Sequence, residues 1–267
     1  MLPRFSKLPG SLAQHARILR LDNGNIPALL IHPDWSTPAP CVLWFHGRTA
    51  HKELDPGRYQ RWLRAGIATC AIDLPGHGER ASQELQVAGR SLEVIEQAVQ
   101  EVDRILAALG DPAFANAFDR RRLGIGGMSA GGMVVLRRLC DPHPFVAAAV
   151  EGTSGSLTTL PSYKDRLESP ALQRLNPILH IEGWRPIRLL ALHSELDAIV
   201  PVSGMREFID RLITQYRLHG ADPALVQLTT WPETGAPQEH LGFGRVAGDA
   251  KNVQTAFFQE HLLSPPV

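Results

Sequence analysis

The stretch "LGIGGMSAGGMVVL", from Leu123 to Leu136, places a single serine between two apolar runs and surrounds it with four glycines. Because glycine lacks a Cβ atom, it lets two chain segments approach closely and lets a turn bend sharply. The centre of the stretch, Gly127-Met128-Ser129-Ala130-Gly131, reads GxSxG, and its flanks favour a strand before it and a helix after it. This context predicts a strained strand-to-helix turn that holds the Ser129 hydroxyl clear of the backbone.

The rest of the chain alternates short apolar runs with helical patterns. Two runs, Ala16–Leu21 and Ile26–Pro33, are joined by a turn that contains Asn-Gly, which predicts a hairpin. Further strands are predicted over Cys41–Gly47, Ile67–Gly78, Arg122–Met128, Phe145–Gly152, Pro186–Ser194 and Leu225–Glu233. Helices are predicted over Arg58–Gly66, Ser91–Leu109, Gly131–Cys140, Ser203–Leu218 and Lys251–Leu262. This alternation predicts an α/β fold with a mostly parallel, twisted sheet of about eight strands and helices on both faces.

The alternation lapses once, between Thr153 and Trp184. We therefore expect a small cap-like insertion at about residues 153–184, after the sixth strand. The length of 267 residues suits one α/β domain with a substantial core. We predict a single domain over residues 1–267 that carries this insertion.

Several polar residues follow predicted strands. In open parallel sheets, ligands bind beyond the carboxyl ends of the strands, so the chemistry is expected in those loops. A serine hydroxyl needs a base to remove its proton, and the base needs a third group to hold it. The chain offers Ser129, then Asp197, then His240, each after a predicted strand. We predict Ser129 as nucleophile, Asp197 as the orienting acid and His240 as the base.

Several motifs together resemble one family, the α/β-hydrolase superfamily, over roughly Ala16 to Glu260. Besides "GMSAG" and His240, they are "FHG" at Phe45–Gly47, "DLPGHGER" at Asp73–Arg80 and "HSELDAIVP" at His193–Pro201. Within the superfamily, the short amino-terminal hairpin and the modest insertion look most like small serine esterases near the dienelactone-hydrolase and prolyl-peptidase branches. The resemblance implies an α/β-hydrolase fold and a catalytic triad of serine, acid and histidine.

The resemblance also implies an oxyanion hole built from the backbone N–H of Ala130 and that of Arg48. The lipase-type "HGGG" is replaced here by His46-Gly47-Arg48-Thr49. Haloalkane dehalogenases and epoxide hydrolases of this fold carry aspartate at the elbow, and dienelactone hydrolases typically carry cysteine. Serine at this position argues against the first two chemistries.

Some residues keep a second interpretation. Asp197 could instead cap a helix or a turn, and Glu151, after the preceding strand, is a rival acid because some members of the fold carry the acid there. His46 favours a structural role that bonds loop backbone beneath the oxyanion hole. His46, Gly47, His193 and Glu151 are candidates for lining the substrate pocket.

The charge balance and composition of the chain limit which classes of partner are expected. Lys plus Arg and Asp plus Glu number 27 each, so no overall field attracts nucleic acid or an anionic membrane. No run of about 18 apolar residues predicts a membrane span, and the start of the chain does not resemble a signal peptide. Cys41, Cys70 and Cys140 lie in apolar runs rather than in metal-ligand spacing, which predicts buried thiols. We expect a soluble, cytoplasmic protein whose partner is a small molecule; the oligomeric state is not predicted.

These observations predict a serine hydrolase that cleaves small carboxylic esters through an acyl-enzyme, with no metal and no cofactor. A serine peptidase or a thioesterase of the same fold is the alternative enzyme. A catalytically silent binding member of the fold is the alternative from another class, and the presence of all three triad residues in the expected order argues against it. The charged residues of the insertion and the roughly sixteen residues before the first strand favour short esters over long-chain lipids or peptides.

Overall fold

The hairpin predicted at the amino end starts the sheet. In the computed structural model, which describes residues 8–263, β1 (Ala16–Leu21) pairs antiparallel with β2 (Ile26–Ile31), and Leu21 lies opposite Ile26. The turn residues Asp22 and Asn23 have left-handed φ angles of 50° and 53°. Asp and Asn tolerate this conformation better than other residues with a side chain, so the local sequence closes the hairpin.

The remaining strands run parallel to one another and join the hairpin through β4, and the sheet has the order β1-β2-β4-β3-β5-β6-β7-β8. Only the β1–β2 and β2–β4 pairs are antiparallel. The prediction of a mostly parallel sheet of about eight strands is confirmed. The six further strands are β3 (Ala39–Phe45), β4 (Ala68–Ile72), β5 (Phe118–Met128), β6 (Ala147–Glu151), β7 (Arg188–Ser194) and β8 (Val226–Trp231).

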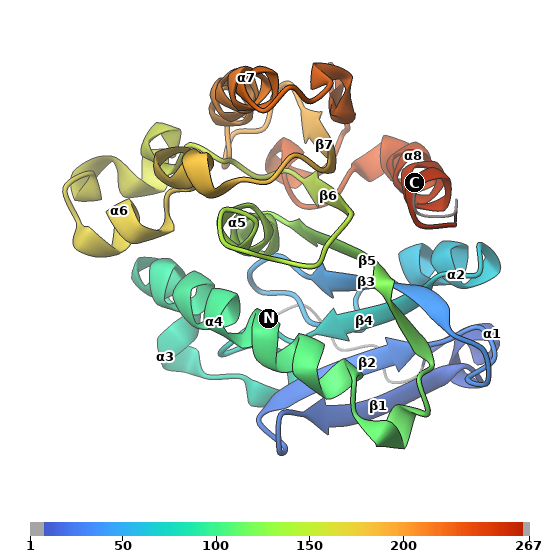
Figure 1. The fold of residues 1–267 in the computed structure, drawn as a ribbon. Coiled ribbons are helices and arrows are strands. Elements are labelled where there is room, and N and C mark those ends of the chain that lie inside the picture. Colours follow the sequence, from blue (N-terminus) through green and yellow to red (C-terminus); the bar gives the residue numbers. More distant parts are fainter. Residues whose placement is uncertain (1–7, 264–267) are drawn as a thin grey trace.

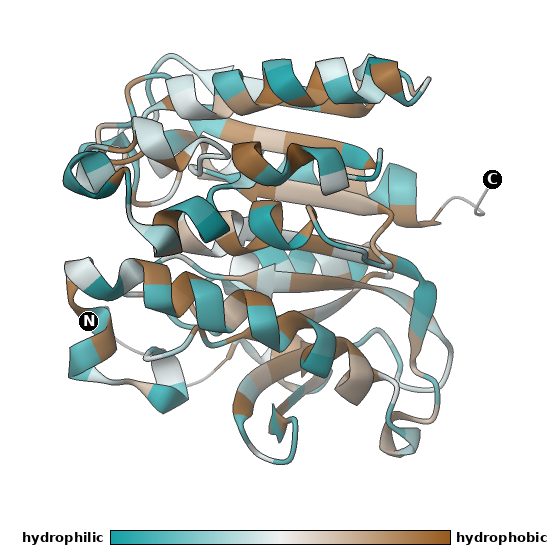
Figure 2. Cartoon of the chain, turned by 60° about the vertical axis from the view of Figure 1, so that its left-hand side comes forward, coloured by the Kyte–Doolittle hydropathy of each residue, from teal (hydrophilic) through white to brown (hydrophobic). Residues whose placement is uncertain are grey.

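Helices cover both faces of the sheet (Figure 1). On one face, α4 (Ser91–Leu109), α5 (Ala130–Arg138) and α7 (Val202–Leu218) share one apolar core with the strands. On the other, α1 (Gly10–Ala13), α2 (Pro56–Arg64) and α8 (Ala247–Leu263) share a second core. In Figure 2 the strands in the middle are largely brown, whereas the helices alternate between brown and teal. This is the pattern of a sheet buried on both faces by amphipathic helices.

Helix α4 shows how the apolar period sets an element. Its bounds, Ser91–Leu109, are those that the period predicts. Seven of the eight apolar positions that define the period are buried, the eight being Leu92, Val94, Ile95, Val99, Val102, Ile105, Leu106 and Leu109. Val99 is the exception and packs against the core while partly exposed. No helix within residues 8–263 is long and apolar enough to span a membrane.

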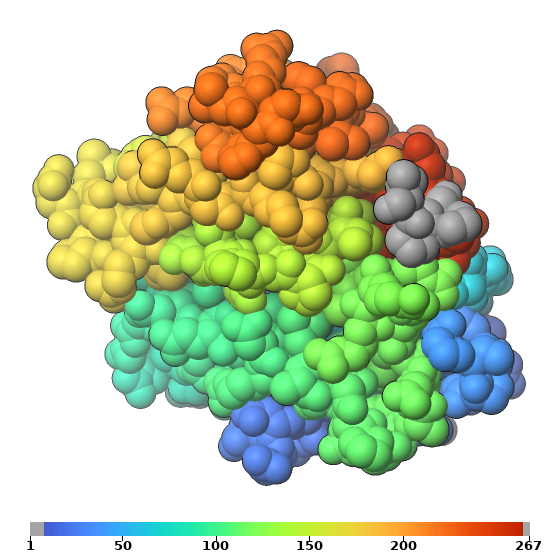
Figure 3. Space-filling view, viewed as in Figure 1, coloured from blue at the N-terminus to red at the C-terminus, as the bar shows by residue number. Residues whose placement is uncertain are grey.

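The segment between β6 and β7 is built from short turns of helix rather than long elements. It holds η4 (Leu157–Thr159), η5 (Pro161–Arg166), α6 (Pro170–Leu175) and η6 (Pro177–Gly183). Its buried side chains Leu157, Tyr163, Leu172 and Trp184 join the core shared by α4, α5 and α7. Its charged side chains Lys164, Asp165, Arg166 and Glu168 are exposed. In Figure 3 this yellow segment forms the left edge of the molecule.

Candidate active site

Ser129 is the single residue that links β5 to α5. It has φ 51° and ψ −118°, a left-handed conformation that costs about 1–3 kcal/mol for a residue with a side chain. Three hydrogen bonds hold it there. Its N–H donates to the carbonyl of Glu151 (2.8 Å), and its own carbonyl accepts from the N–H of Met133 (3.0 Å) and the hydroxyl of Thr153 (2.8 Å). The end of β6 therefore clamps the strained turn.

The glycines around Ser129 are explained by close contact rather than by unusual φ angles. A Cβ atom added at Gly131 would lie 2.2 Å from the carbonyl oxygen of Phe45, at the end of β3. One added at Gly127 would lie 2.5 Å from the backbone of Gly131. No real Cβ fits at such distances, so only glycine lets the first turn of α5 pack against β3 and β5. The sequence motif and the tight turn thus have one physical cause.

Ser129, His240 and Asp197 form a continuous chain of hydrogen bonds. His240 Nε2 lies 2.9 Å from Ser129 Oγ, and His240 Nδ1 lies 2.7 Å from Asp197 Oδ2. Since an ionised carboxylate can only accept, Nδ1 carries the proton and Nε2 is left to accept from the serine hydroxyl. Asp197 and His240 are each 6% exposed, and Ser129 is partly exposed. Of these three side chains, Ser129 is therefore the one whose hydroxyl a ligand can reach.

Asp197 is held as a carboxylate by its own loop. Its Oδ1 accepts from the N–H groups of Ile199 (2.9 Å) and Val200 (2.7 Å). Burial alone would raise the pKa of Asp197, but the imidazoles of His193 and His240 and the N–H of Val200 outweigh it and lower this pKa to about 2. The group facing His240 Nδ1 is therefore a permanent negative charge near neutral pH.

The loop that carries His240 is strained and is tied down by Glu239. Gln238 and Glu239 have left-handed φ angles of 56° and 54°. The Glu239 carboxylate accepts from the hydroxyl of Ser194 (2.7 Å), the N–H (2.6 Å) and hydroxyl (2.7 Å) of Thr234, and the N–H of Gly235 (2.7 Å). These bonds lower the pKa of Glu239 to about 2. Since Ser194 ends β7 just before Asp197, Glu239 links the loops that carry Asp197 and His240.

The rival acid, Glu151, has other partners. Its two carboxylate oxygens accept from Arg58 Nη1 (2.7 Å) and Nη2 (2.8 Å), and Gln254 Nε2 donates to Oε1 (3.1 Å). The Arg58 guanidinium also stacks 4.1 Å from the centre of a Trp44 ring. Glu151 is 1% exposed. Of the two candidate acids, Asp197 is the one in contact with His240.

The loop after β3 runs beside the serine. A Cβ at Gly47 would lie 3.5 Å from Ser129 Cβ, so the backbone that continues into Arg48 passes next to the hydroxyl. On the other side, Ala130 begins α5, and the N–H groups of a helix's first turn have no acceptor within the helix. Two backbone segments thus pass close to Ser129. The arrangement is suited to receiving a negatively charged oxygen.

His46 and His193 are both buried and hydrogen-bonded. His46 Nδ1 donates to the carbonyl of Gly47 (2.7 Å), and its Nε2 accepts from the N–H of Leu74 (3.0 Å). Burial lowers the pKa of His46 to about 3, so it stays neutral and joins the loops after β3 and β4. His193 Nε2 lies 2.8 Å from the carbonyl of Val200 and 3.5 Å from Asp197 Oδ2. Both imidazoles support the loops of the candidate site.

Sequence reasoning missed Glu239, Arg58 and Gln254. The sequence offers a signal for Glu239, an acid directly before the candidate base in "QEHLG". It offers none for Arg58 and Gln254, which lie on α2 and α8 and meet Glu151 only through the fold. Within residues 8–263 no group of three or more His, Cys, Asp or Glu side chains is placed to hold a metal ion. The thiols of Cys41, Cys70 and Cys140 are free and buried, as predicted.

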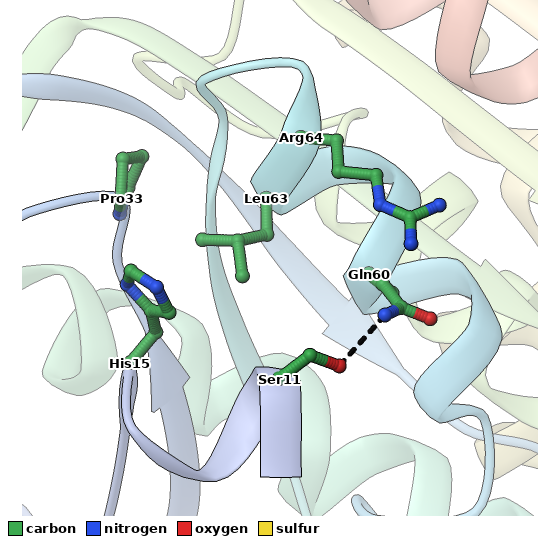
Figure 4. Close-up of a pocket in the computed structure, with 6 residues that line it drawn as sticks. All are labelled: Ser11, His15, Pro33, Gln60, Leu63 and Arg64. Carbon is green, nitrogen blue, oxygen red and sulfur yellow. Dashed lines mark hydrogen bonds between the residues drawn. The ribbon is translucent and has the colours of Figure 1, made fainter. Parts of the chain in front are cut away.

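A separate pocket lies at the other edge of the sheet (Figure 4). It has a volume of about 280 Å³ and is open to solvent. Leu63 and Arg64 end α2 just before β4 begins, which places the pocket at the amino-terminal edge of the parallel strands. The triad lies at the carboxyl edge, so the two sites are distinct. The pocket is lined by Ser11, His15, Pro33, Gln60, Leu63 and Arg64.

Known sequences match most of the chain. A sequence profile described as "Alpha/beta hydrolase family" matches residues 28–265. The chain is also 32% identical over 260 residues to Esterase YjfP of Escherichia coli (strain K12), and the match covers 89% of this chain and 96% of the esterase.

Solved structures extend the likeness. TT1662 from Thermus thermophilus has a TM-score of 0.71 at 22% identity, and the match covers 94% of this chain and 98% of that one. The Pyrococcus horikoshii acylaminoacyl peptidase has a TM-score of 0.73 at 18% identity. There the match covers 94% of this chain but 42% of the peptidase, so this chain spans less than half of that enzyme. At such identities the likeness shows a shared fold.

Proposed function

Since the chain belongs to the α/β-hydrolase family, with the fold that its sequence predicts, we propose that it is a serine esterase acting on small carboxylic esters. In this proposal Ser129 is the nucleophile, His240 the general base and Asp197 the acid that orients it. The carrying observation is the unbroken chain of hydrogen bonds from Ser129 Oγ through His240 to Asp197, at 2.9 and 2.7 Å. A protein that only binds a ligand has no need of this chain.

The reaction follows from the contacts. His240 Nε2 takes the hydroxyl proton as Ser129 Oγ attacks the carbonyl carbon, and Asp197 stabilises the imidazolium that forms. The negative oxygen of the tetrahedral intermediate accepts from the N–H groups of Ala130 and Arg48, each such donor contributing roughly 10² to 10³ in rate. The intermediate collapses when His240 returns the proton to the departing alcohol. Water, deprotonated by His240, then attacks the acyl-serine and releases the acid and the free hydroxyl.

The choice of an ester rests on the relative of 32% identity, whose name describes it as an esterase. The acylaminoacyl peptidase has the same fold, so cleavage of peptide bonds is the alternative that this likeness favours. A thioester would be attacked by the same groups. Amide bonds need more transition-state stabilisation than activated esters, so ester turnover is expected to be the faster of the two.

We further propose short acyl chains, a small-molecule partner and a cytoplasmic location. The exposed face of the segment between β6 and β7 carries Lys164, Asp165, Arg166 and Glu168, which suits a long apolar acyl chain poorly. The equal numbers of acidic and basic residues give no field that would favour nucleic acid or an anionic membrane. Three free buried thiols are consistent with a reducing compartment.

The test combines labelling with turnover. A serine-reactive phosphonate probe should label Ser129, and Ser129→Ala should abolish both labelling and hydrolysis of acetyl aryl ester. Ser203→Ala, at an exposed serine on α7, is the matched control and should change neither. Across aryl esters, turnover should be highest from acetyl to butyryl and fall sharply by about ten carbons. Labelling that persists in Ser129→Ala, or faster cleavage of aminoacyl anilides than of acetyl esters, would overturn the proposal.

A further inference from the structure

Arg48 belongs to the loop that passes beside the candidate nucleophile. It follows Gly47, whose added Cβ would lie 3.5 Å from Ser129 Cβ, in the loop between β3 and α2. Its side chain is partly buried and extends to α3 (Gln83–Gln86), where Nη2 donates to the carbonyl oxygen of Gln86. The guanidinium is thus held at the end of the short helix that follows the β4 loop.

This charge has no counter-ion in the part of the chain that the structure describes. No carboxylate among residues 8–263 lies within 4.0 Å of the Arg48 guanidinium, and its Nε is buried without a hydrogen-bond partner. Other arginines that are buried or largely buried behave differently. Arg58 pairs with Glu151 (2.7 Å), Arg80 with Glu101 (2.6 Å) and Arg138 with Asp103 (2.5 Å). Fully buried charges are normally paired, and the charge of the partly buried Arg48 is less compensated than the charges of these three arginines.

The Arg48 charge affects the pKa values of two neighbouring side chains, Tyr163 and His77. Burial raises the pKa of the Tyr163 phenol, and the Arg48 charge acts against this rise. Burial lowers the pKa of His77, and the Arg48 charge adds to that fall. Tyr163 lies in the segment after β6 and His77 in the loop after β4. The Arg48 charge thus acts on groups in the segment after β6 and in the β4 loop, while its guanidinium is bonded at α3.

We propose that the Arg48 guanidinium binds a carboxylate carried by the substrate, so that the preferred substrates are esters bearing a negative charge. This inference rests on the proposed esterase function and specifies its substrate class. A guanidinium is well matched to a carboxylate because its planar N–H groups bond both oxygens. Arg48 Nη1 has no hydrogen bond within residues 8–263, so donors remain beyond the one used by Gln86. The substrate carboxylate supplies the missing counter-ion.

The test compares ester pairs in which one member carries a carboxylate where the other carries an uncharged group. On the alcohol side the pair is para-acetoxybenzoate and para-acetoxybenzamide, and on the acyl side it is a monoaryl adipate and the aryl hexanoate. The measured quantity is the ratio of kcat/KM for the charged ester to that for the neutral ester. Because each variant is compared by this ratio, any intrinsic difference in reactivity between the two esters cancels. Charge-assisted hydrogen bonds predict a preference of about tenfold to a hundredfold in at least one pair.

Three variants assign the preference to Arg48. Arg48→Met should bring the ratio close to that of the uncatalysed reaction, and Arg48→Lys should keep part of it because the charge remains. Arg166→Met is the matched control, since Arg166 is an exposed arginine of the segment between β6 and β7 whose Nη1 donates to the carbonyl of Gly89. It should keep the wild-type ratio. Wild-type protein that turns over both neutral esters without preferring a charged one would refute the inference and leave the esterase function standing. A ratio unchanged in Arg48→Met would refute it equally.

A binding measurement makes the outcome independent of turnover. Adipate and para-hydroxybenzoate carry the carboxylates of the two charged esters, and calorimetry gives their affinities directly. Arg48→Met should weaken the tighter of the two at least tenfold, and Arg166→Met should not. Equal affinity for wild type and Arg48→Met would contradict the carboxylate site. If the wild-type protein binds the carboxylate but the phosphonate probe does not label Ser129, the proposed function is overturned and the carboxylate site stands.

Discussion

Glu151→Gln and Asp197→Asn separate the two acids that follow neighbouring strands. Asp197 contacts His240 Nδ1 at 2.7 Å, whereas Glu151 contacts Arg58 at 2.7 and 2.8 Å. If Asp197 orients the base, its amide analogue presents an N–H or a neutral oxygen to His240 and favours the wrong tautomer. The expected fall in kcat is on the order of 10⁴, by analogy with other serine triads.

Glu151→Gln should instead act on stability. Arg58 is 4% exposed, and removing the Glu151 charge leaves it with Asp55, 3.1 Å away and partly exposed, as its remaining carboxylate. Breaking a buried pair costs about 3–5 kcal/mol, and the retained Asp55 favours the lower end, about 3 kcal/mol. At roughly 2–4 °C per kcal/mol for a chain of this size, the thermal midpoint should fall by about 6–12 °C. Turnover of the folded protein should change by less than about tenfold, since the carbonyl that holds Ser129 is retained.

The assay measures kcat on an acetyl aryl ester near neutral pH together with the midpoint of thermal unfolding by circular dichroism. Asp197→Asn should lower kcat by the larger factor, and Glu151→Gln should lower the midpoint without a comparable loss of kcat. The reasoning is refuted if folded Glu151→Gln loses a thousandfold or more in kcat while Asp197→Asn keeps most of its activity. The acid would then belong at the end of β6.

Two further changes test the loops around the site. Glu239 has a pKa of about 2 in the folded chain against an ordinary value of 4.5, so the unfolded chain binds more protons between these values and stability falls as pH drops through that window. Glu239→Gln should flatten this acid dependence of stability and lower kcat more than it changes KM. Glu233→Gln removes an exposed acid of the same loop and should do neither. An unchanged acid-unfolding curve in Glu239→Gln would argue against the role of Glu239 in joining the loops that carry Asp197 and His240. Gly131→Ala would bring a Cβ within 2.2 Å of the Phe45 carbonyl, and overpacking of this kind costs about 1–3 kcal/mol or more. Gly248→Ala, where a Cβ meets nothing within 4 Å, should be neutral or slightly stabilising, and equal thermal midpoints for the two variants would contradict the close-packing explanation.

Local patterns were enough to predict most of the fold. The apolar period of Ser91–Leu109 marks α4 residue for residue, and the Asn-Gly turn marks the first hairpin, because both depend on neighbours close in sequence. Strand limits were less predictable. β5 begins at Phe118, four residues before the predicted start, because Phe118 pairs with Ala39 of β3; the polar stretch between Phe118 and Leu123 forms an irregularity in this pairing. The short helix α3 likewise had no period to reveal it.

For the site, the sequence by itself determined the candidates, and the tertiary structure decided which side chains meet. The sequence shows GxSxG between apolar runs and the order Ser129, Asp197, His240. Because a parallel sheet brings the carboxyl ends of its strands to one edge, residues that follow different strands can be predicted to meet there. Whether Asp197 or Glu151 contacts His240 depends on ångström-scale distances between loops from different strands. The contacts of Glu151 with Arg58, 93 residues away, and with Gln254, 103 residues away, carry no spacing signal. That Arg48 has no carboxylate partner among residues 8–263 likewise emerges only from the folded structure, because a missing partner is a property of the surroundings and not of the residue.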